Sequence, residues 1–337
     1  MHIPDGYLSP QTYAVLDAAI IPLWAVAGAK VKKTLKAKQV PLLALGAAFS
    51  FVIMMFNVPV FGGSTGHAVG ATLIAILLGP WAAAIAVSIA LVIQALVFGD
   101  GGITAIGANV LNMAIIMPFV GYYIYRLVSG DGPSNIRRTV AAGIGSYAGI
   151  VVAAIAAGIE FGIQPLIAHT ASGQALYAPY PLSVAVPAMA LEHMLFFGPV
   201  EAVVTMGIVA VLARQDSNLL QMKPAARPLR WLWAGFAALV LLTPIGVLAP
   251  GTAWGEWSAA ELKRTLGYVP AGLSKLGSVW TAAMPDYAPA FIRNPMVGYL
   301  LAAVVGSALV VGITWLLGKL LARKESDPKP TAPPNAT

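Results

Sequence analysis

Residues 81–98, WAAAIAVSIALVIQALVF, form a run of 18 residues without a single charged side chain. A helix of this length rises about 27 Å, close to the roughly 30 Å thickness of the hydrocarbon core of a bilayer. The run at 67–79 is shorter, and a helix over it would rise only about 20 Å. The sequence therefore predicts an all-α polytopic membrane protein with nine membrane segments. The other apolar segments fall at 11–30, 41–57, 103–128, 139–163, 183–213, 231–249 and 295–322.

The composition agrees with this class. Hydrophobic residues make up 58% of the 337-residue chain and charged residues 10%, with a mean hydropathy of +0.80. Soluble domains carry about 25% charged residues. Cysteine is absent, which excludes disulfides and thiolate metal sites.

The basic residues predict an orientation. Of the 20 lysines and arginines, 16 fall in four stretches, at 30–38, 126–138, 214–230 and 319–329. With nine spans these stretches share one face, which the positive-inside rule assigns to the cytoplasm. We therefore expect an external amino terminus and a cytoplasmic carboxyl terminus. The net charge of +7 is then a topology signal and gives no indication of nucleic-acid binding.

Composition shifts divide the chain into a larger and a smaller part. We expect a seven-helix module at 1–213 and, after a polar cytoplasmic linker at 214–230, a two-helix module at 231–324. The second module encloses a long external segment, 250–294, rich in glycine, proline and tryptophan. The tail 325–337 has the composition of a disordered segment.

The chain opens MHIPDG, and no signal-peptide pattern is found there. We expect Met1 to be retained, because initiator methionine is trimmed mainly before small residues. The amine of Met1, the main-chain nitrogen of His2 and Nδ1 of His2 can then close two adjacent chelate rings around one cation. All-nitrogen tetragonal sites suit Cu(II) and Ni(II), and also Co(II), better than Mg(II) or Ca(II). The alternative is that His2 is simply a polar residue at a frayed terminus.

His67 can supply the fourth nitrogen, because the glycine-rich loop that carries it, Gly62 to Gly66, shares the external face with the amino terminus. The sequence thus predicts a metal site formed by Met1, His2 and His67. Other residues could support the ligands by hydrogen bonds, and the candidates are Asp5, Ser64, Thr65, Asp100, Asn109 and Asn112. The alternative is that Asp5 is a turn residue and that Asn109 and Asn112 form hydrogen bonds between helices.

Segment 183–213 contains Glu192, His193 and Glu201, which is unusual because ionisable groups are costly at membrane depth. They form either a gate or partner contact, or an internal hydrogen-bond network. The chain has no GxxxxGK[ST] stretch and no HExxH motif, so we expect it to bind no nucleotide. Energy for uphill movement would come from a gradient or from another subunit.

Several of these stretches resemble the CbiM/NikM family, the membrane components of energy-coupling-factor importers for cobalt and nickel. Residues 231–322 are similar to the small CbiN/NikN component, fused to the same chain, with patches at 254–257 and 285–287. The resemblance implies that Met1, His2 and His67 bind the metal. It also implies a transmembrane coupling protein and a pair of cytoplasmic ATPases as partners. The similar stretches of the larger part are MHIPDGYLSP at 1–10, 62–67 with Gly70, 79–81, FGDGGITAIGANVLNM at 98–113, and His193, Gly198-Pro199, Glu201-Ala202 and Thr205.

We therefore expect a non-enzymatic, metal-capturing component in the plasma membrane of a prokaryote, with Co(II) or Ni(II) as its substrate. The sequence does not distinguish Co(II) from Ni(II). It also does not indicate whether the transported metal serves cobalamin synthesis or a nickel enzyme. A second hypothesis is a self-sufficient channel or proton-coupled carrier that uses Glu160, Glu192 and Glu201. A third, an intramembrane metalloenzyme, needs an open coordination position and a nearby general base.

Overall fold

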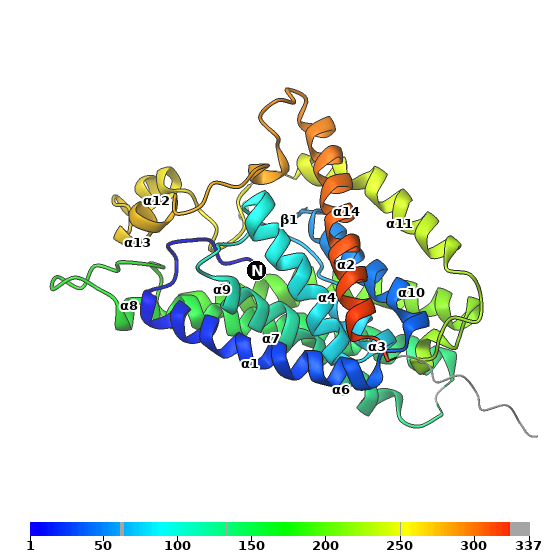
Figure 1. Cartoon of the computed structure of the whole chain (residues 1–337). Helices are drawn as coiled ribbons and strands as arrows, with labels where there is room; N and C mark the ends of the chain where they lie inside the picture. The colour runs from blue at the N-terminus through cyan, green and yellow to red at the C-terminus, as the bar shows by residue number, and fades with distance from the viewer. Residues whose placement is uncertain (61–63, 133, 250, 324–337) are drawn as a thin grey trace, which may run out of the picture.

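The computed structural model describes residues 1–60, 64–132, 134–249 and 251–323. In these ranges, eight helical segments are long and apolar enough to cross a membrane (Figure 1). The predicted all-α, multi-pass membrane fold is therefore confirmed. The main helices are α1 (Pro10–Thr34), α2 (Val40–Met54), α4 (Pro80–Ile93), α6 (Met117–Ser129), α7 (Asn135–Gly162), α9 (Leu182–Glu192), α10 (Gly198–Gln215), α11 (Arg230–Leu242) and α14 (Pro295–Leu321).

Short elements extend or connect these helices. Strands β1 (Val58–Pro59) and β2 (Thr65–Gly66) pair antiparallel, with Val58 opposite Gly66 and Pro59 opposite Thr65. The short helices are η1 (Ala37–Gln39), α3 (Ala71–Leu78), α5 (Ile106–Asn109), α8 (Gln164–Ile167), η5 (Leu219–Gln221), η6 (Thr243–Leu248), α12 (Ala259–Leu266), α13 (Ala271–Leu276) and η7 (Pro285–Tyr287).

Local sequence explains where several helices begin. Pro10, Pro80 and Pro295 open α1, α4 and α14, at the position where the missing N–H costs nothing. Asn294 caps α14, because its side-chain oxygen accepts hydrogen bonds from the main-chain N–H groups of Met296 and Val297.

The segment predicted as a membrane helix at 67–79 differs from the prediction. Only Ala71–Leu78 is helical there, which corresponds to a rise of about 12 Å. Gly70 has φ = 73°, a left-handed conformation that favours glycine, and the chain before it is a buried loop. Ser50 of α2 ties this loop to the bundle by donating to the carbonyl of Val69 at 2.8 Å. The prediction of a ninth membrane-length helix is therefore wrong.

The basic stretches gather at one end of the bundle, here named the basic end. The side chain of Asn135 donates to the carbonyl of Ala213, and that of Gln39 donates to the carbonyl of Met222. At the end of α14, the N–H of Arg323 donates to the carbonyl of Leu35. These contacts connect the four predicted stretches, either directly or through the residue next to a stretch, as for Gln39 and Ala213. Residues 324–337, which include Lys324, Lys329 and the tail predicted to be disordered, lie outside the described residues.

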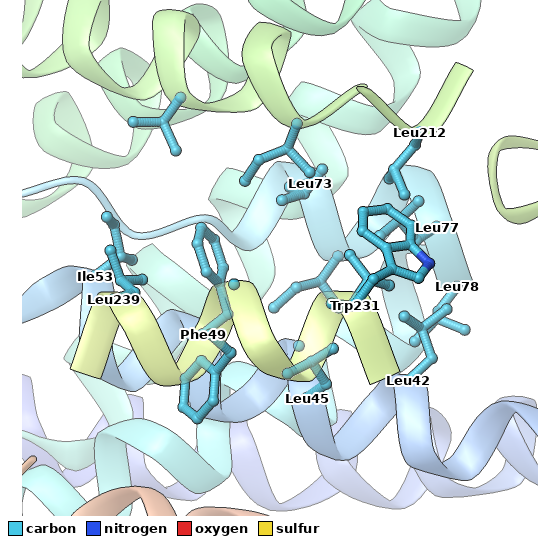
Figure 2. A pocket seen from close by; sticks show the side chains of 17 residues that line it. Leu42, Leu45, Phe49, Ile53, Leu73, Leu77, Leu78, Leu212, Trp231 and Leu239 are labelled. Carbon is cyan, nitrogen blue, oxygen red and sulfur yellow. The ribbon is translucent and has the colours of Figure 1, made fainter. Parts of the chain in front are cut away.

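A cavity of about 390 Å³ lies between α2, α3, α10 and α11 (Figure 2). Its lining is apolar, from Leu42 and Phe49 on α2 to Trp231 and Leu239 on α11. It offers no oxygen or imidazole side chain to a cation, so a cation site must lie elsewhere. Helix α14 does not line this cavity but packs closely on α2. A Cβ added at Gly306 of α14 would collide with the ring of Phe51 of α2.

In the part of the chain that the structure describes, three π-helical turns interrupt the long helices. They are η2 (Gln94–Phe98) after α4, η3 (Val110–Ile116) between α5 and α6, and η4 (His193–Phe197) between α9 and α10. Each contains a buried polar side chain, namely Gln94, Asn112 and His193. Because π turns occur frequently at functional sites, these positions indicate where to look for one.

Candidate metal centre

The first residues of the chain are buried inside the protein. Met1 and His2 are only 5% and 2% exposed, and Figure 1 shows the amino terminus within the molecule. Asn109 fixes the next residue, because it accepts from the N–H of Ile3 at 2.8 Å and donates to the carbonyl of Ile3 at 3.2 Å. The N–H of Gly102 donates to the same carbonyl at 2.8 Å. The residue that follows His2 is thus held from both sides.

Asp5 joins this amino-terminal segment to the turn after η2. Its carboxylate accepts hydrogen bonds from the N–H groups of Ile103 and Thr104, at 3.1 and 2.8 Å, and from the Thr104 hydroxyl. Gly102 allows the close approach, since a Cβ there would lie 2.3 Å from the main-chain nitrogen of Asp5. The predicted supporting residue Asp5 therefore acts on the loops rather than on a histidine.

The loop that carries His67 is anchored by a carboxylate from α10. Glu201 accepts from the N–H of Val69 at 2.7 Å and from the N–H of Gly70 at 3.1 Å. The ring of Phe197 covers Gly66, leaving no room for a side chain. Glu201 consequently satisfies two buried donors next to His67, as an internal hydrogen-bond network requires.

The two histidines face each other. Nε2 of His67 lies 3.2 Å from Nδ1 of His2, and the ring centroids are 5.1 Å apart. Nδ1 of His67 lies 3.1 Å from the carbonyl of Ala68, which can only accept, so this nitrogen carries the proton. The lone pair on Nε2 of His67 then points toward His2. One carboxylate oxygen of Asp100 lies 3.1 Å from Nδ1 of His2.

Burial keeps both imidazoles neutral. Desolvation, assisted by the nearby amino-terminal charge, lowers the pKa of His2 to about 3. The same two causes, together with His2 itself, hold the pKa of His67 well below its usual range. Desolvation raises the pKa of Asp100. At neutral pH, both rings therefore keep a lone pair available for a cation.

The amine at the start of the chain faces a carboxylate from the smaller module. The amine of Met1 lies 3.8 Å from Oε1 of Glu256. Burial raises the pKa of Glu256 to about 7, and the charge of the amine opposes that rise. The side chains of Glu256 and Asp100 are 25% and 19% exposed, so these two carboxylates form the more open side of the cluster.

The segment around Glu256 contacts both loops that carry the histidines. The N–H of Trp254 donates to the hydroxyl of Ser64 at 3.1 Å, and the hydroxyl of Tyr7 donates to the carbonyl of Trp257. The indole of Trp254 also packs against the rings of Phe161 and Trp257, with centroids 5.8 and 5.2 Å apart. The smaller module thereby holds the two loops together.

Tyr287, from the same module, reaches the cluster from another side. Its hydroxyl donates to Asp100 at 2.6 Å and accepts from the side-chain nitrogen of Gln94 at 3.0 Å. Its ring stacks on Phe98, with centroids 4.8 Å apart. Asp286 and Tyr287 have φ values of 52° and 58°, which non-glycine residues rarely adopt, so packing holds this turn against local strain.

The spacing of the nitrogens suits one small cation. Two neighbouring nitrogens in a planar site, each about 2 Å from the metal, lie about 2.8 Å apart. The separation of 3.2 Å between the two histidines is close to that value. Among the described residues, no three side chains of His, Asp or Glu gather in a metal-binding arrangement, so a site here requires main-chain nitrogens as well.

The structure brings most of the predicted site residues together, while two supporting candidates make other contacts. Thr65 pairs with Pro59 between β1 and β2, and Asn112 donates to Glu160 at 2.7 Å. His193 makes its hydrogen bond outside the cluster, because its Nδ1 lies 2.8 Å from the carbonyl of Met189. Gly62 and Gly63 lie outside the described residues. The prediction of a gate or partner contact at Glu192, His193 and Glu201 stays a prediction.

Sequence reasoning missed Gln94, Glu256 and Tyr287 as parts of this cluster. Gln94 is the one polar side chain besides Ser88 in the apolar run 81–98, and a buried polar residue in such a run was a usable signal. Glu256 and Tyr287 lie in the patches at 254–257 and 285–287 that resemble the small component, but nothing in those patches indicated a contact with the histidine cluster, because their partners lie far away in the sequence.

Fold and cluster together define a multi-pass membrane protein whose candidate cation site is built from loops at the end of the bundle opposite the basic end. The family model for the cobalt uptake substrate-specific transmembrane region matches residues 2–219, and the model for the PDGLE domain matches residues 229–323. The chain belongs to this CbiM family of metal transport proteins and carries a fused PDGLE domain. It is therefore a transport protein and not an enzyme in the ordinary sense.

Several relatives span nearly the whole chain. The fused nickel transport protein NikMN of Rhodobacter capsulatus is 52% identical, over 92% of this chain and 95% of the relative. The probable fused nickel transport protein LarMN of Lactiplantibacillus plantarum is 47% identical, over 90% and 93%. A crystal structure of a truncated transition metal transporter is 56% identical and covers 64% of this chain and 99% of its own, with a TM-score of 0.60.

Proposed function

We propose that this chain is the metal-capturing component of an importer for Ni(II) or Co(II). The substrate ion is held in a plane by four nitrogens: the amine of Met1, the main-chain nitrogen and Nδ1 of His2, and Nε2 of His67. The observation that carries the proposal is the 3.2 Å approach of two neutral imidazoles beside a buried amine.

The donor set favours this class of cargo. The peptide nitrogen of His2 binds only after losing its proton, which requires a metal with strong in-plane bonds. Four nitrogens in a tetragonal arrangement suit Ni(II), and their lack of oxygen makes a poor site for Mg(II) or Ca(II). The nickel transport proteins among the relatives, and the cobalt uptake family model, support the same two ions.

Capture takes place at the outer face in this proposal. The positive-inside rule assigns the basic end to the cytoplasm, which leaves the histidine cluster on the external side. The amino terminus is then external and the end of α14 cytoplasmic. An ion arriving from outside meets the carboxylates of Asp100 and Glu256 before the buried nitrogens.

Energy for release is supplied by other subunits. The chain contains no phosphate-binding GxxxxGK[ST] loop, and its family resemblance supports a transmembrane coupling protein with a pair of cytoplasmic ATPases. The rival hypothesis is a self-sufficient channel or carrier. It is tested with the purified chain in liposomes, where uptake of Ni(II) without ATPases would refute the proposed dependence on partners.

The metal site is tested by extending the amino terminus. The extension is Gly-Ser-Gly-Ser, because a single added residue would place the histidine third, where a new planar chelate could form. We expect titration calorimetry with Ni(II) and Co(II) to show loss of high-affinity binding, while the same four residues added after Thr337 leave it unchanged. Equal affinity of the two extended proteins would refute the site.

A further inference from the structure

Two atoms beside the candidate metal centre are buried and lack hydrogen-bond partners. They are Nε2 of His2 and Oε1 of Gln94. Such atoms are uncommon in folded proteins, and each calls for an explanation. The two side chains are neighbours, because both contact the carboxylate of Asp100: the Gln94 nitrogen lies 3.3 Å from one of its oxygens and Nδ1 of His2 lies 3.1 Å from the other. The two atoms are complementary, since an imidazole N–H donates and an amide oxygen accepts.

The orientation of the Gln94 amide is fixed from its other side. Its nitrogen donates to the hydroxyl of Tyr287 at 3.0 Å and to the carboxylate of Asp100 at 3.3 Å. The Tyr287 proton is itself directed at Asp100, so the phenol oxygen is available as an acceptor. Because only the amide nitrogen can donate, Oε1 points the other way and is left to accept.

The hydrogen bonds around His2 also indicate which of its nitrogens carries the proton before a metal binds. Nδ1 of His2 lies 3.2 Å from Nε2 of His67, which bears a lone pair, and 3.1 Å from a carboxylate oxygen of Asp100. Both neighbours accept. A neutral His2 therefore carries its proton on Nδ1 and its Nε2 is bare, so neither this nitrogen nor the amide oxygen of Gln94 has a proton to donate to the other.

We propose that Gln94 is a positioning residue for the metal-loaded state, an inference that rests on the proposed function. When the cation takes Nδ1 of His2, the proton on Nδ1 leaves to solvent and Nε2 gains one, so that the ring stays neutral. The new Nε2–H donates to Oε1 of Gln94. This bond fixes the ring with its Nδ1 lone pair on the metal, as partners of metal-bound histidines generally do.

Tyr287 extends this role to the smaller module. Its hydroxyl holds the Gln94 nitrogen, and its ring stacks on Phe98 in the same π turn as Gln94. The position of the smaller module thus sets the position of the acceptor that the loaded His2 needs. A matched control exists nearby: Tyr299 packs against Tyr287 at 5.4 Å, but its hydroxyl donates to the carbonyl of Met55.

The test uses the full chain in detergent micelles with ¹⁵N-labelled histidine and Ni(II) as the probe. Square-planar Ni(II) has no unpaired electrons, so the nitrogen resonances of His2 can be followed. We expect the proton of His2 on Nδ1 without metal and on Nε2 with Ni(II). Gln94→Leu should weaken Ni(II) binding about 10–100-fold. Tyr287→Phe should weaken it by a smaller factor, and Tyr299→Phe should leave it unchanged. Thermal melting checks that each variant is folded.

The possible failures are distinguishable. If Gln94→Leu binds Ni(II) as tightly as the natural protein, or if Nε2 of His2 is already protonated without metal, the role of Gln94 is refuted and the metal site stands. If Gln94→Leu does not fold, the nitrogen spectra of the natural protein decide the question. If the natural protein binds neither Ni(II) nor Co(II), the proposed function itself fails.

Discussion

Replacing Glu201 should loosen the loop that carries His67 without touching any proposed ligand. In the natural protein, the carboxylate accepts two main-chain N–H groups, from Val69 at 2.7 Å and Gly70 at 3.1 Å. Oε2 accepts from both N–H groups, and Oε1 accepts from that of Gly70 as well. Glu201→Gln can keep its one oxygen at the Oε2 position, but it loses the negative charge of the acceptor and the second bond to Gly70.

The expected magnitude follows from the lost charge. Hydrogen bonds to charged groups contribute about 1.5–3 kcal/mol and those to neutral groups about 0.5–1.5 kcal/mol, so weakening the bonds to Val69 and Gly70 costs about 1–3 kcal/mol. If the whole cost falls on holding His67 in place, the affinity for Ni(II) drops roughly 5- to 150-fold, since 1.4 kcal/mol corresponds to a factor of ten. Glu201→Leu leaves both N–H donors without an acceptor. It should lower the free energy of unfolding by about 2–6 kcal/mol, which is enough to threaten folding.

The assay is titration calorimetry with Ni(II), alongside thermal melting with and without the ion. Glu160→Gln is the matched control, because Glu160 is also a buried carboxylate within the bundle but accepts from the side chain of Asn112. We expect the control to bind Ni(II) within about a factor of two of the natural protein. The reason is that this substitution changes no hydrogen bond to the loop that carries His67. Weaker binding in the control together with unchanged binding in Glu201→Gln would refute the reasoning.

Two further predictions concern protons and packing. Because the pKa of His2 is about 3 and that of His67 is also far below neutral, neither imidazole competes for protons between pH 6 and 7. Metal binding still displaces the proton of the His2 peptide nitrogen, so the Kd should rise at least about tenfold for each unit of acidification. Calorimetry at pH 6.0, 6.5 and 7.0 measures this slope, and a Kd that does not change with pH would exclude the peptide nitrogen. Gly102→Ala should lower both Ni(II) affinity and Tm, because its Cβ would lie 2.3 Å from the main chain of Asp5. Gly207→Ala, which has open space around it, serves as the control, and equal Tm values would contradict this account.

The membrane helices were predictable because a bilayer constrains sequence strongly. A chain in hydrocarbon must satisfy its own main-chain hydrogen bonds, so long apolar runs become helices. The failure at 67–79 has a physical reason. Every residue of α3 is buried inside the protein, so its apolar character serves packing rather than contact with lipid. Hydropathy alone does not distinguish the two, and a left-handed glycine at Gly70 permits the loop.

The candidate site was predictable where local chemistry indicated it. Met1 and His2 form a chelating pair by their positions, and His67 follows a glycine-rich loop. Gln94 and Tyr287 were not predictable as partners, because they are separated by 193 residues and meet only through the fold. The π turn that contains Gln94 also has no signature in the residue pattern, since it depends on the surrounding bundle.

The hydrogen bond between Tyr7 and Trp257 has a consequence for biosynthesis. These residues are separated by 250 positions. At a synthesis rate of about 5–20 residues per second, Trp257 leaves the ribosome roughly 12–50 s after Tyr7. During this interval the amino-terminal segment has left the ribosome but lacks its hydrogen bond to Trp257. Any protein that assists membrane insertion therefore encounters the segment before the smaller module covers it.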